Sequence, residues 1–287
     1  MIEITESRKR IGNYLDYREK IIISLDYHYV FLAINAAINK INIVRILCVI
    51  ALSQTQQQWL TRDITMIKSL ANILVHPNAF FQNALSEKES LKIPGLIVIL
   101  LGIVSAVNAY LIGGLTGKML AGLLPGMESI IAISTILGAL FGVFLFWVIW
   151  TGVFFLISSI FKGKGAFKRS LEFVGYGYLP QIFGAILNVI VALQYIPRVI
   201  VPQITSSAAQ DPQMIIDATS ALMHDPAMME LTQITSLISI VFLLWSANIW
   251  ISGMRSARQL SDRNSALCVG MPVVVYILYI IFTMTGI

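Results

Sequence analysis

Few residues in this chain have types and spacings that could do chemistry. The three histidines, His28, His76 and His224, lie far apart, and the sequence contains no HExxH, no GxSxG and no paired metal-ligand spacing. The two cysteines, Cys48 and Cys268, form neither a CxxC pair nor a disulfide framework. We therefore expect no catalytic residue, no metal site and no cofactor, and we expect Cys268 to be a buried free thiol.

Two weaker patterns have simpler explanations. The stretch GGLTGK at residues 113–118 is similar to a phosphate-binding loop. However, three residues instead of four separate Gly113 from Gly117, and Met119 stands where Ser or Thr belongs, so we interpret it as the flexible end of a span. Acidic residues near His224 could bind a cation weakly, but their irregular spacing favours a solvated acidic loop.

The composition indicates a membrane protein. The 287 residues are 57% hydrophobic and 12% charged, whereas about 25% of residues are charged in ordinary globular proteins. The mean hydropathy is +0.78, and a water-soluble fold of this size could not cover so much apolar surface. The net charge is +5, but the basic residues lie at the ends of apolar segments and form no stripe for nucleic acid. We therefore expect a lipid bilayer as partner and no nucleic acid.

Five segments are long and apolar enough to cross a hydrocarbon core, which needs ~20 apolar residues of helix. They cover residues 94–115, 130–161, 175–196, 231–253 and 267–287, and none contains Asp, Glu, Lys or Arg. A lone apolar chain in lipid must satisfy its own backbone hydrogen bonds, so each segment is predicted to be a helix. The predicted fold class is all-α: a polytopic bundle of five transmembrane helices.

The basic residues predict the orientation of these spans. Eleven Lys and Arg fall in alternate connections, whereas the other connections hold Lys118 and Arg198. Cytoplasmic loops carry the excess of Lys and Arg, so we predict a cytoplasmic N-terminus and an external C-terminus. Seven candidate anchors for topology or anionic lipid are Lys162, Lys164, Lys168, Arg169, Arg255, Arg258 and Arg263. The first four are close enough to bind lipid headgroups or an acidic partner, although topology anchoring alone also explains them.

The external loop at residues 197–230 contains two helix starts, Asp211-Pro212 and Asp225-Pro226. Asp is a favoured N-cap and Pro is favoured at the first helical position. We predict two short amphipathic helices here, with the second running into the fourth span.

The N-terminal part of the chain fits the remainder poorly. Residues 1–65 contain apolar runs broken by charged residues, and residues 29–52 are a weak candidate for a sixth span. We interpret residues 1–65 as an extension or a mis-assigned start, with translation beginning at Met66. The membrane domain then covers residues 66–287 and opens with an interfacial helix, a break at Pro77 and a second short helix.

Small and polar residues inside the spans predict helix packing. Gly138 and Gly142 form a GxxxG step in the second span, which lets another helix approach closely. The candidate contacts in the third span are Gly175, Gly177, Tyr178, Pro180, Gln181 and Asn188. These positions either pack the helices of one chain together or bind a partner helix. The first hypothesis for function is therefore a non-enzymatic scaffold or adaptor that binds other membrane proteins or itself. The alternative is a permease-like subunit for an uncharged or lipidic solute, motivated by Asn108, Gln181 and Asn188.

Several stretches resemble the Yip1 domain family, and in particular its prokaryotic members. They are Pro77-Asn78-Ala79-Phe80-Phe81, FKGKGAFK at residues 161–168, GYGYLP at residues 175–180, and the ending that contains Trp250, Gly253-Met254-Arg255, Leu260-Ser261, Ala266 and Pro272. The resemblance covers about residue 66 to the C-terminus. It implies a five-helix membrane bundle with a cytoplasmic N-terminus, in the cell membrane of a prokaryote, and it brings no catalytic residue.

Eukaryotic members of the family are linked to vesicle traffic and to binding of Rab-type GTPases. This chain has Lys92-Ile93-Pro94-Gly95 near the first span, where that role is marked by an Asp-Leu-x-Gly-Pro element. The resemblance therefore implies the fold, whereas this departure argues against GTPase binding.

Overall fold

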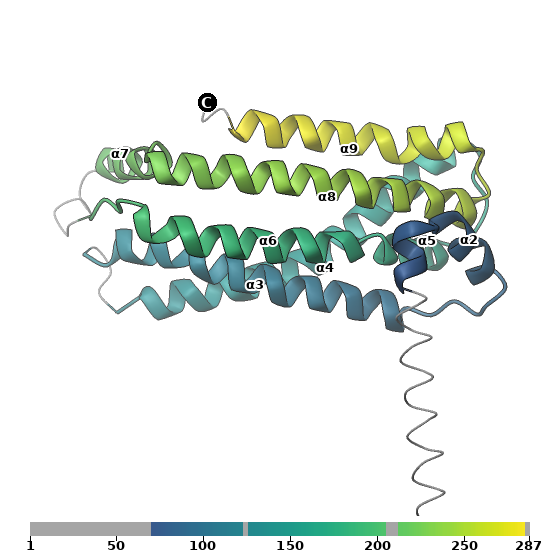
Figure 1. The fold of residues 1–287 in the computed structure, drawn as a ribbon, viewed down its shortest axis with the longest axis horizontal. Helices are drawn as coiled ribbons and strands as arrows, with labels where there is room; N and C mark the ends of the chain where they lie inside the picture. Colours follow the sequence, from purple (N-terminus) through teal and green to yellow (C-terminus); the bar gives the residue numbers. More distant parts are fainter. Residues whose placement is uncertain (1–69, 123–125, 205–211, 285–287) are drawn as a thin grey trace, which may run out of the picture. The chain divides into compact units, whose positions relative to one another are not determined.

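A computed structural model describes residues 70–122, 126–204 and 212–284, which belong to one compact unit, Lys68–Ile287. Every regular element in these residues is a helix, so the predicted all-α class is confirmed (Figure 1). The elements are α2 (Pro77–Ala84), α3 (Lys92–Leu120), α4 (Glu128–Ile160), α5 (Phe167–Tyr176), α6 (Leu179–Tyr195), η1 (Ile196–Arg198), α7 (Pro212–Met223), α8 (Pro226–Arg258) and α9 (Asp262–Met284). The suggested extension at residues 1–65, the start at Met66 and the candidate sixth span lie outside the described residues.

Five of these helices are long and apolar enough to cross a membrane: α3, α4, α6 continued by η1, α8 and α9. At 1.5 Å per residue, even the 20 residues of Leu179–Arg198 reach about 30 Å, the thickness of a hydrocarbon core. The helices α4 and α8 have 33 residues each, so each must tilt or extend beyond the core. The predicted number of spans is confirmed.

The predicted start of the third span is wrong. Gly175 and Tyr176 end a separate ten-residue helix, α5, and the membrane-crossing helix α6 begins at Leu179. The physical reason is the sequence between them: Gly177 ends α5, and Pro180 stands in the first turn of α6, where the missing proline N–H costs nothing. The connection predicted between spans two and three therefore contains an amphipathic helix.

The proline-initiated helices are confirmed. α7 begins at Pro212 and α8 at Pro226, and α8 continues without a break into the fourth span. The Oδ1 atom of Asp225 accepts a hydrogen bond from the backbone N–H of Met228 at 3.1 Å, as an N-cap should. Its Oδ2 atom accepts a second bond from the backbone N–H of Ile200 at 3.2 Å, which ties the chain after η1 to the start of α8.

The segment before the first span also follows the prediction. Residues 70–75 are helical, His76 interrupts the helix, and α2 begins at Pro77. Ile73 and Phe81 are completely buried, so each part anchors an apolar side chain in the bundle.

The spans pack side by side in one bundle. Helix α3 lies along α4 and also packs against α6, and α8 lies between α6 and α9 (Figure 1). We name the two ends of the bundle by the short helices there. The α5 end carries α2, α5, the 161–166 connection and the last turn of α8, and the α7 end carries the end of α3, the start of α4, η1 and α7 (Figure 1). Large buried side chains such as Phe81, Phe173, Trp250 and Met254 gather toward the α5 end.

Candidate functional site

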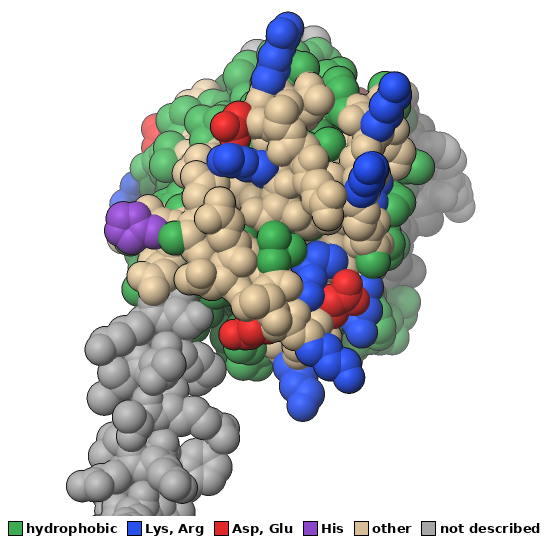
Figure 2. All heavy atoms as spheres, turned by 90° about the vertical axis from the view of Figure 1, so that its right-hand side faces the viewer, with side chains coloured by type: hydrophobic (Ala, Val, Ile, Leu, Met, Phe, Trp, Pro, Cys, Tyr) green, Lys and Arg blue, Asp and Glu red, His purple; other side chains and the backbone are tan. Residues whose placement is uncertain are grey.

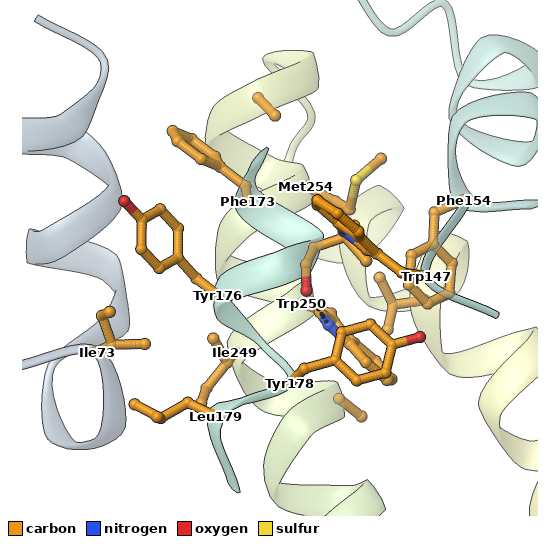
Figure 3. Close-up of a cluster of buried hydrophobic side chains, with 14 of the residues drawn as sticks. Ile73, Trp147, Phe154, Phe173, Tyr176, Tyr178, Leu179, Ile249, Trp250 and Met254 are labelled. Carbon is orange, nitrogen blue, oxygen red and sulfur yellow. Dashed lines mark hydrogen bonds between the residues drawn. The ribbon is translucent and has the colours of Figure 1, made fainter. Parts of the chain in front are cut away.

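The longest run of buried residues in the described chain is the joint between α5 and α6, residues 172–180. This α5–α6 joint contains the GYGYLP stretch that the sequence analysis singled out. Figure 3 shows its side chains pointing to different sides: Tyr176 lies toward the helix that carries Ile73, and Tyr178 lies on the opposite side, beside Trp250. The joint is therefore surrounded by α2, α3, α4 and α8.

Two positions of the joint are occupied by glycine because atoms of neighbouring helices fill the space that a Cβ would need. A Cβ at Gly175 would stand 2.6 Å from the Cβ of Pro94 in α3 and 3.0 Å from the Trp147 ring in α4. A Cβ at Gly177 would overlap the indole of Trp250 in α8. Both predicted contact positions, Gly175 and Gly177, therefore pack against other helices of the same chain.

Two tryptophans from the spans donate hydrogen bonds to backbone carbonyls of α5. The indole N–H of Trp147 donates to the backbone carbonyl of Leu171 at 2.9 Å, and that of Trp250 donates to the carbonyl of Val174 at 2.8 Å. The carbonyl of Val174 also accepts a hydrogen bond from the backbone N–H of Gly177 at 3.0 Å, so the indole bonds add to the backbone bonding of α5 and tie that helix to α4 and α8. Sequence reasoning missed both roles, because a tryptophan in an apolar span gives no sign of which carbonyl it meets.

Aromatic rings fill the remaining space around the joint. Trp250 is stacked on Trp150 at 5.6 Å between ring centroids and meets Tyr178 edge-on at 5.4 Å. The hydroxyl of Tyr178 is buried and has no hydrogen-bond partner among the described residues. Burial raises the pKa of Tyr178 and also that of Tyr176, the latter to about 12, so both hydroxyls keep their protons at neutral pH.

Arg169 connects α5 to the chain that follows α2. Its guanidinium donates to the backbone carbonyls of Ala84 at 3.3 Å and Glu87 at 2.7 Å, and it pairs with Glu172 at 2.9 Å. Its side chain is 12% exposed. Desolvation raises the pKa of Glu172, although a backbone bond at Ser90 and the charge of Arg169 act in the opposite direction. Arg169 is therefore an internal clamp and is not a free anchor for lipid.

Arg258 is a second clamp, at the end of α8. It donates to the Ser158 hydroxyl at 2.9 Å, to the carbonyl of Gly163 at 2.7 Å and to the carbonyl of Gly165, and its guanidinium lies 4.0 Å from the centre of the Phe155 ring. The residue is 4% exposed. The role of Arg258 as a topology anchor stays a prediction, but its guanidinium is not free to bind a lipid headgroup, because its donors bond to Ser158 and to the 161–166 connection. No sequence signal distinguishes it from Arg255 one turn earlier.

The remaining predicted anchors are exposed or half-buried. Arg255 is half-buried, with a side chain that is 38% exposed, and it pairs with the exposed Asp262 at 2.7 Å. Lys162, Lys164, Lys168 and Arg263 are exposed. Figure 2 looks at the α5 end and shows Lys and Arg side chains projecting from it, with few Asp or Glu among them.

The GxxxG step of α4 meets nothing in its own bundle. No atom of another element lies within 4 Å of a Cβ built at Gly138 or Gly142. Gly138 is exposed, as is Ser134 one helical turn before it. The interpretation in which this step packs helices of the same chain is therefore wrong for the described residues, and the partner-helix interpretation stays a prediction.

The two predicted polar positions of α6 differ. The Asn188 amide donates to the Ser239 hydroxyl of α8 at 3.2 Å, which is a hydrogen bond between helices. Its oxygen is buried without a partner among the described residues, as is the amide oxygen of Asn108 in α3. Gln181 is half-buried, and its backbone N–H donates to the carbonyl of Tyr178 at 3.0 Å.

The candidates for chemistry are scattered. His76 and His224 are both exposed, at different ends of the bundle, and His28 lies outside the described residues. Cys268 is buried and free, as predicted. The described ranges contain no group of three or more His, Cys, Asp or Glu that could hold a metal ion. The GGLTGK stretch is continuous helix within α3, so the flexible end predicted there is wrong.

The comparisons with known proteins cover the same part of the chain. The Yip1 domain matches residues 71–284, which include all five candidate spans. An uncharacterized protein of the archaeon Methanocaldococcus jannaschii is 37% identical over 131 residues, which are 44% of this chain and 90% of that protein. No solved structure matches the chain. With five apolar helices inside the matched residues, this is an integral multi-pass membrane protein that belongs to the Yip1 domain family.

Proposed function

We propose that this protein is a non-enzymatic scaffold or adaptor, which binds other membrane proteins or a second copy of itself through the open face of α4. The observation that carries the proposal is the glycine step of that helix. Gly138 and Gly142 stand one helical turn apart on α4, and no atom of another element lies within 4 Å of a Cβ position at either, whereas Gly175 and Gly177 are tightly covered by other helices.

The physical basis is how helices associate in lipid. Lipid tails are as apolar as leucine, so burying leucine against leucine gives little, and small residues favour association because they let two backbones approach. Ser134, Gly138 and Gly142 follow one another at four-residue steps along one face of α4. Only 17% of the apolar window of α4 is buried inside the bundle, against 22–28% for the other four spans. The face is therefore open along much of its length.

Site-specific photocrosslinking tests the proposal in the native membrane. A photoreactive phenylalanine at Phe141, which is 72% exposed beside the glycine step, should crosslink to a membrane protein or to a second copy. The same probe at Val275 in α9, which is 67% exposed, is the matched control and should give lipid adducts. Mass spectrometry of the adducts distinguishes self-association from binding of another protein.

A pair of substitutions tests the glycine step directly. Gly138→Leu together with Gly142→Leu should abolish the Phe141 crosslink, because two leucines hold the partner backbone away. Gly270→Leu in α9 is the control, since a Cβ there also meets nothing within 4 Å. An unchanged crosslink in the double variant, or equal protein adducts at Phe141 and Val275, would refute this route of association.

A permease-like subunit for an uncharged or lipidic solute is the second candidate. It is favoured by the buried, unpartnered amide oxygens of Asn108 in α3 and Asn188 in α6, since a solute with a hydroxyl or amide donor would satisfy them. Flux of labelled neutral solutes into proteoliposomes tests this function. Flux equal to that of empty vesicles would remove it, and flux lost in Asn188→Leu would support it.

The orientation of the bundle in the membrane is part of the same proposal. We place the α5 end in the cytoplasm of a prokaryotic cell, where its exposed Lys162, Lys164 and Lys168 would face anionic lipid headgroups or an acidic partner. A membrane-impermeant thiol reagent should label Gln203→Cys, at the α7 end, in intact cells. It should label Lys164→Cys only after lysis, and the opposite pattern would reverse the topology.

A further inference from the structure

A hollow opens at the α7 end, away from the α5–α6 joint. It has a volume of about 550 Å³, which lies within the range of ordinary small-molecule sites. Its apolar wall includes Leu111 and Leu115 of α3, Ile133 and Ile136 of α4, and Ile196 of η1. Two consecutive helices, α3 and α4, and the distant η1 therefore surround one apolar space near the ends of two spans.

The hollow exists because α3 carries glycine on this side. Gly114 lines it, and no atom of another element lies within 4 Å of a Cβ built there. The preceding residue, Gly113, faces another side of the same helix and packs tightly, with a Cβ position 2.6 Å from the Thr135 hydroxyl. The two helices are thus held close at Gly113 while space remains beside Gly114.

Two opposite charges stand at this hollow. Lys118 lies in the last turn of α3 and Glu128 in the first turn of α4, and both line the hollow together with Ser129. Both side chains are exposed, and neither has an ion-pair partner among the described residues. These turns lie near the ends of spans, at the depth of lipid headgroups.

We propose that this hollow binds a phospholipid whose headgroup carries both a phosphate and a primary ammonium. Lys118 pairs with the phosphate, Glu128 accepts hydrogen bonds from the ammonium, and an acyl chain lies against the apolar wall. Charge complementarity selects this occupant: an anionic headgroup without an amine leaves Glu128 unpaired, and a quaternary ammonium has no N–H to donate to it. The proposal is independent of the association face of α4.

Native mass spectrometry of the purified full-length protein in detergent tests the proposal. Phosphatidylethanolamine, phosphatidylcholine and phosphatidylglycerol with identical acyl chains are titrated separately. We expect the ethanolamine lipid to bind about tenfold more tightly than the other two, which corresponds to one charge-assisted hydrogen bond. Glu128→Gln should remove the preference, and Lys118→Gln should weaken binding of all three phosphate-bearing lipids by about tenfold.

The control variants use the same helix. Gly114→Leu fills the hollow and should abolish selective binding, whereas Gly95→Leu, at the other end of α3 and equally open, should not. Lys92→Gln is the matched charge control for Lys118→Gln. Equal binding of the three lipids, or selective binding that survives Gly114→Leu, would overturn the proposal. Binding of phosphatidylglycerol as tight as phosphatidylethanolamine, unaffected by Glu128→Gln, would overturn the assignment of the amine.

Discussion

Replacing Gly177 with alanine adds one methyl group at the most crowded point of the α5–α6 joint. The backbone there is in the right-handed helical region, with φ −68°, so alanine causes no backbone strain. The added Cβ overlaps the indole of Trp250, which is 1% exposed and donates to the carbonyl of Val174. Any effect of the substitution therefore comes from this overlap.

The expected cost follows from two effects. Inserting a methyl group into a well-packed core costs about 1–3 kcal/mol, and displacing Trp250 from its hydrogen bond adds about 1 kcal/mol. Alanine recovers about 0.5–1 kcal/mol, because it loses less backbone entropy than glycine on folding. We therefore expect Gly177→Ala to lower the free energy of unfolding by about 1–3.5 kcal/mol.

Gly142→Ala is the matched control, because a Cβ at Gly142 meets nothing within 4 Å. It should leave stability unchanged or raise it by about 0.5–1 kcal/mol. The assay is unfolding of the purified protein in detergent micelles by titration with sodium dodecyl sulfate, followed by far-ultraviolet circular dichroism. If the two variants agree within about 0.5 kcal/mol, the close approach of Trp250 to Gly177 is refuted.

Three further predictions use the same titration. Arg258→Lys should lower the free energy of unfolding by about 2–4 kcal/mol, because lysine cannot donate to all the acceptors that hold the connection between α4 and α5. Arg255→Lys is the control and should lower it by less than about 0.5 kcal/mol, because that ion pair is open to solvent. Equal losses in the two variants would contradict the role of Arg258 as a clamp. Asp225→Ala should lower the free energy of unfolding by about 1 kcal/mol, because α8 loses its N-cap. Glu230→Ala, at an exposed position, is the control, and equal stability of the two variants would argue against the cap. Burial raises the pKa of Glu172 above its usual 4.5, so the folded protein holds that proton more tightly than the unfolded chain. Stability should then fall as the pH rises from 4.5 through the raised pKa, and Glu172→Gln should lose this part of the dependence; parallel curves for parent and variant would contradict it.

The number and type of the elements could be predicted because the membrane imposes simple rules. A span needs a long apolar run, and the helices α3, α4, α8 and α9 follow from hydropathy alone. The cap at Asp225 follows from local chemistry, since the acceptor and the N–H it satisfies are three residues apart. The start of α6 could not be placed in the same way, because α5 is half apolar and merges with the span in a hydropathy profile.

The candidate site was predicted only in part. Gly175 and Gly177 were singled out correctly as close-approach positions, but their neighbours Pro94, Trp147 and Trp250 come from three other helices. No spacing within the chain encodes which of these helices faces the joint.

Hydropathy and charge by themselves determined that this chain is a five-span helical membrane protein whose basic residues gather at one end. Tertiary structure alone decided what each residue type does. Gly177 meets an indole while Gly138 meets no other element, and Arg258 is a buried clamp while Arg255, one turn away, is half-buried and pairs with an exposed aspartate. The physical reason is that periodicity along one helix specifies a face, whereas packing against other helices specifies what that face touches.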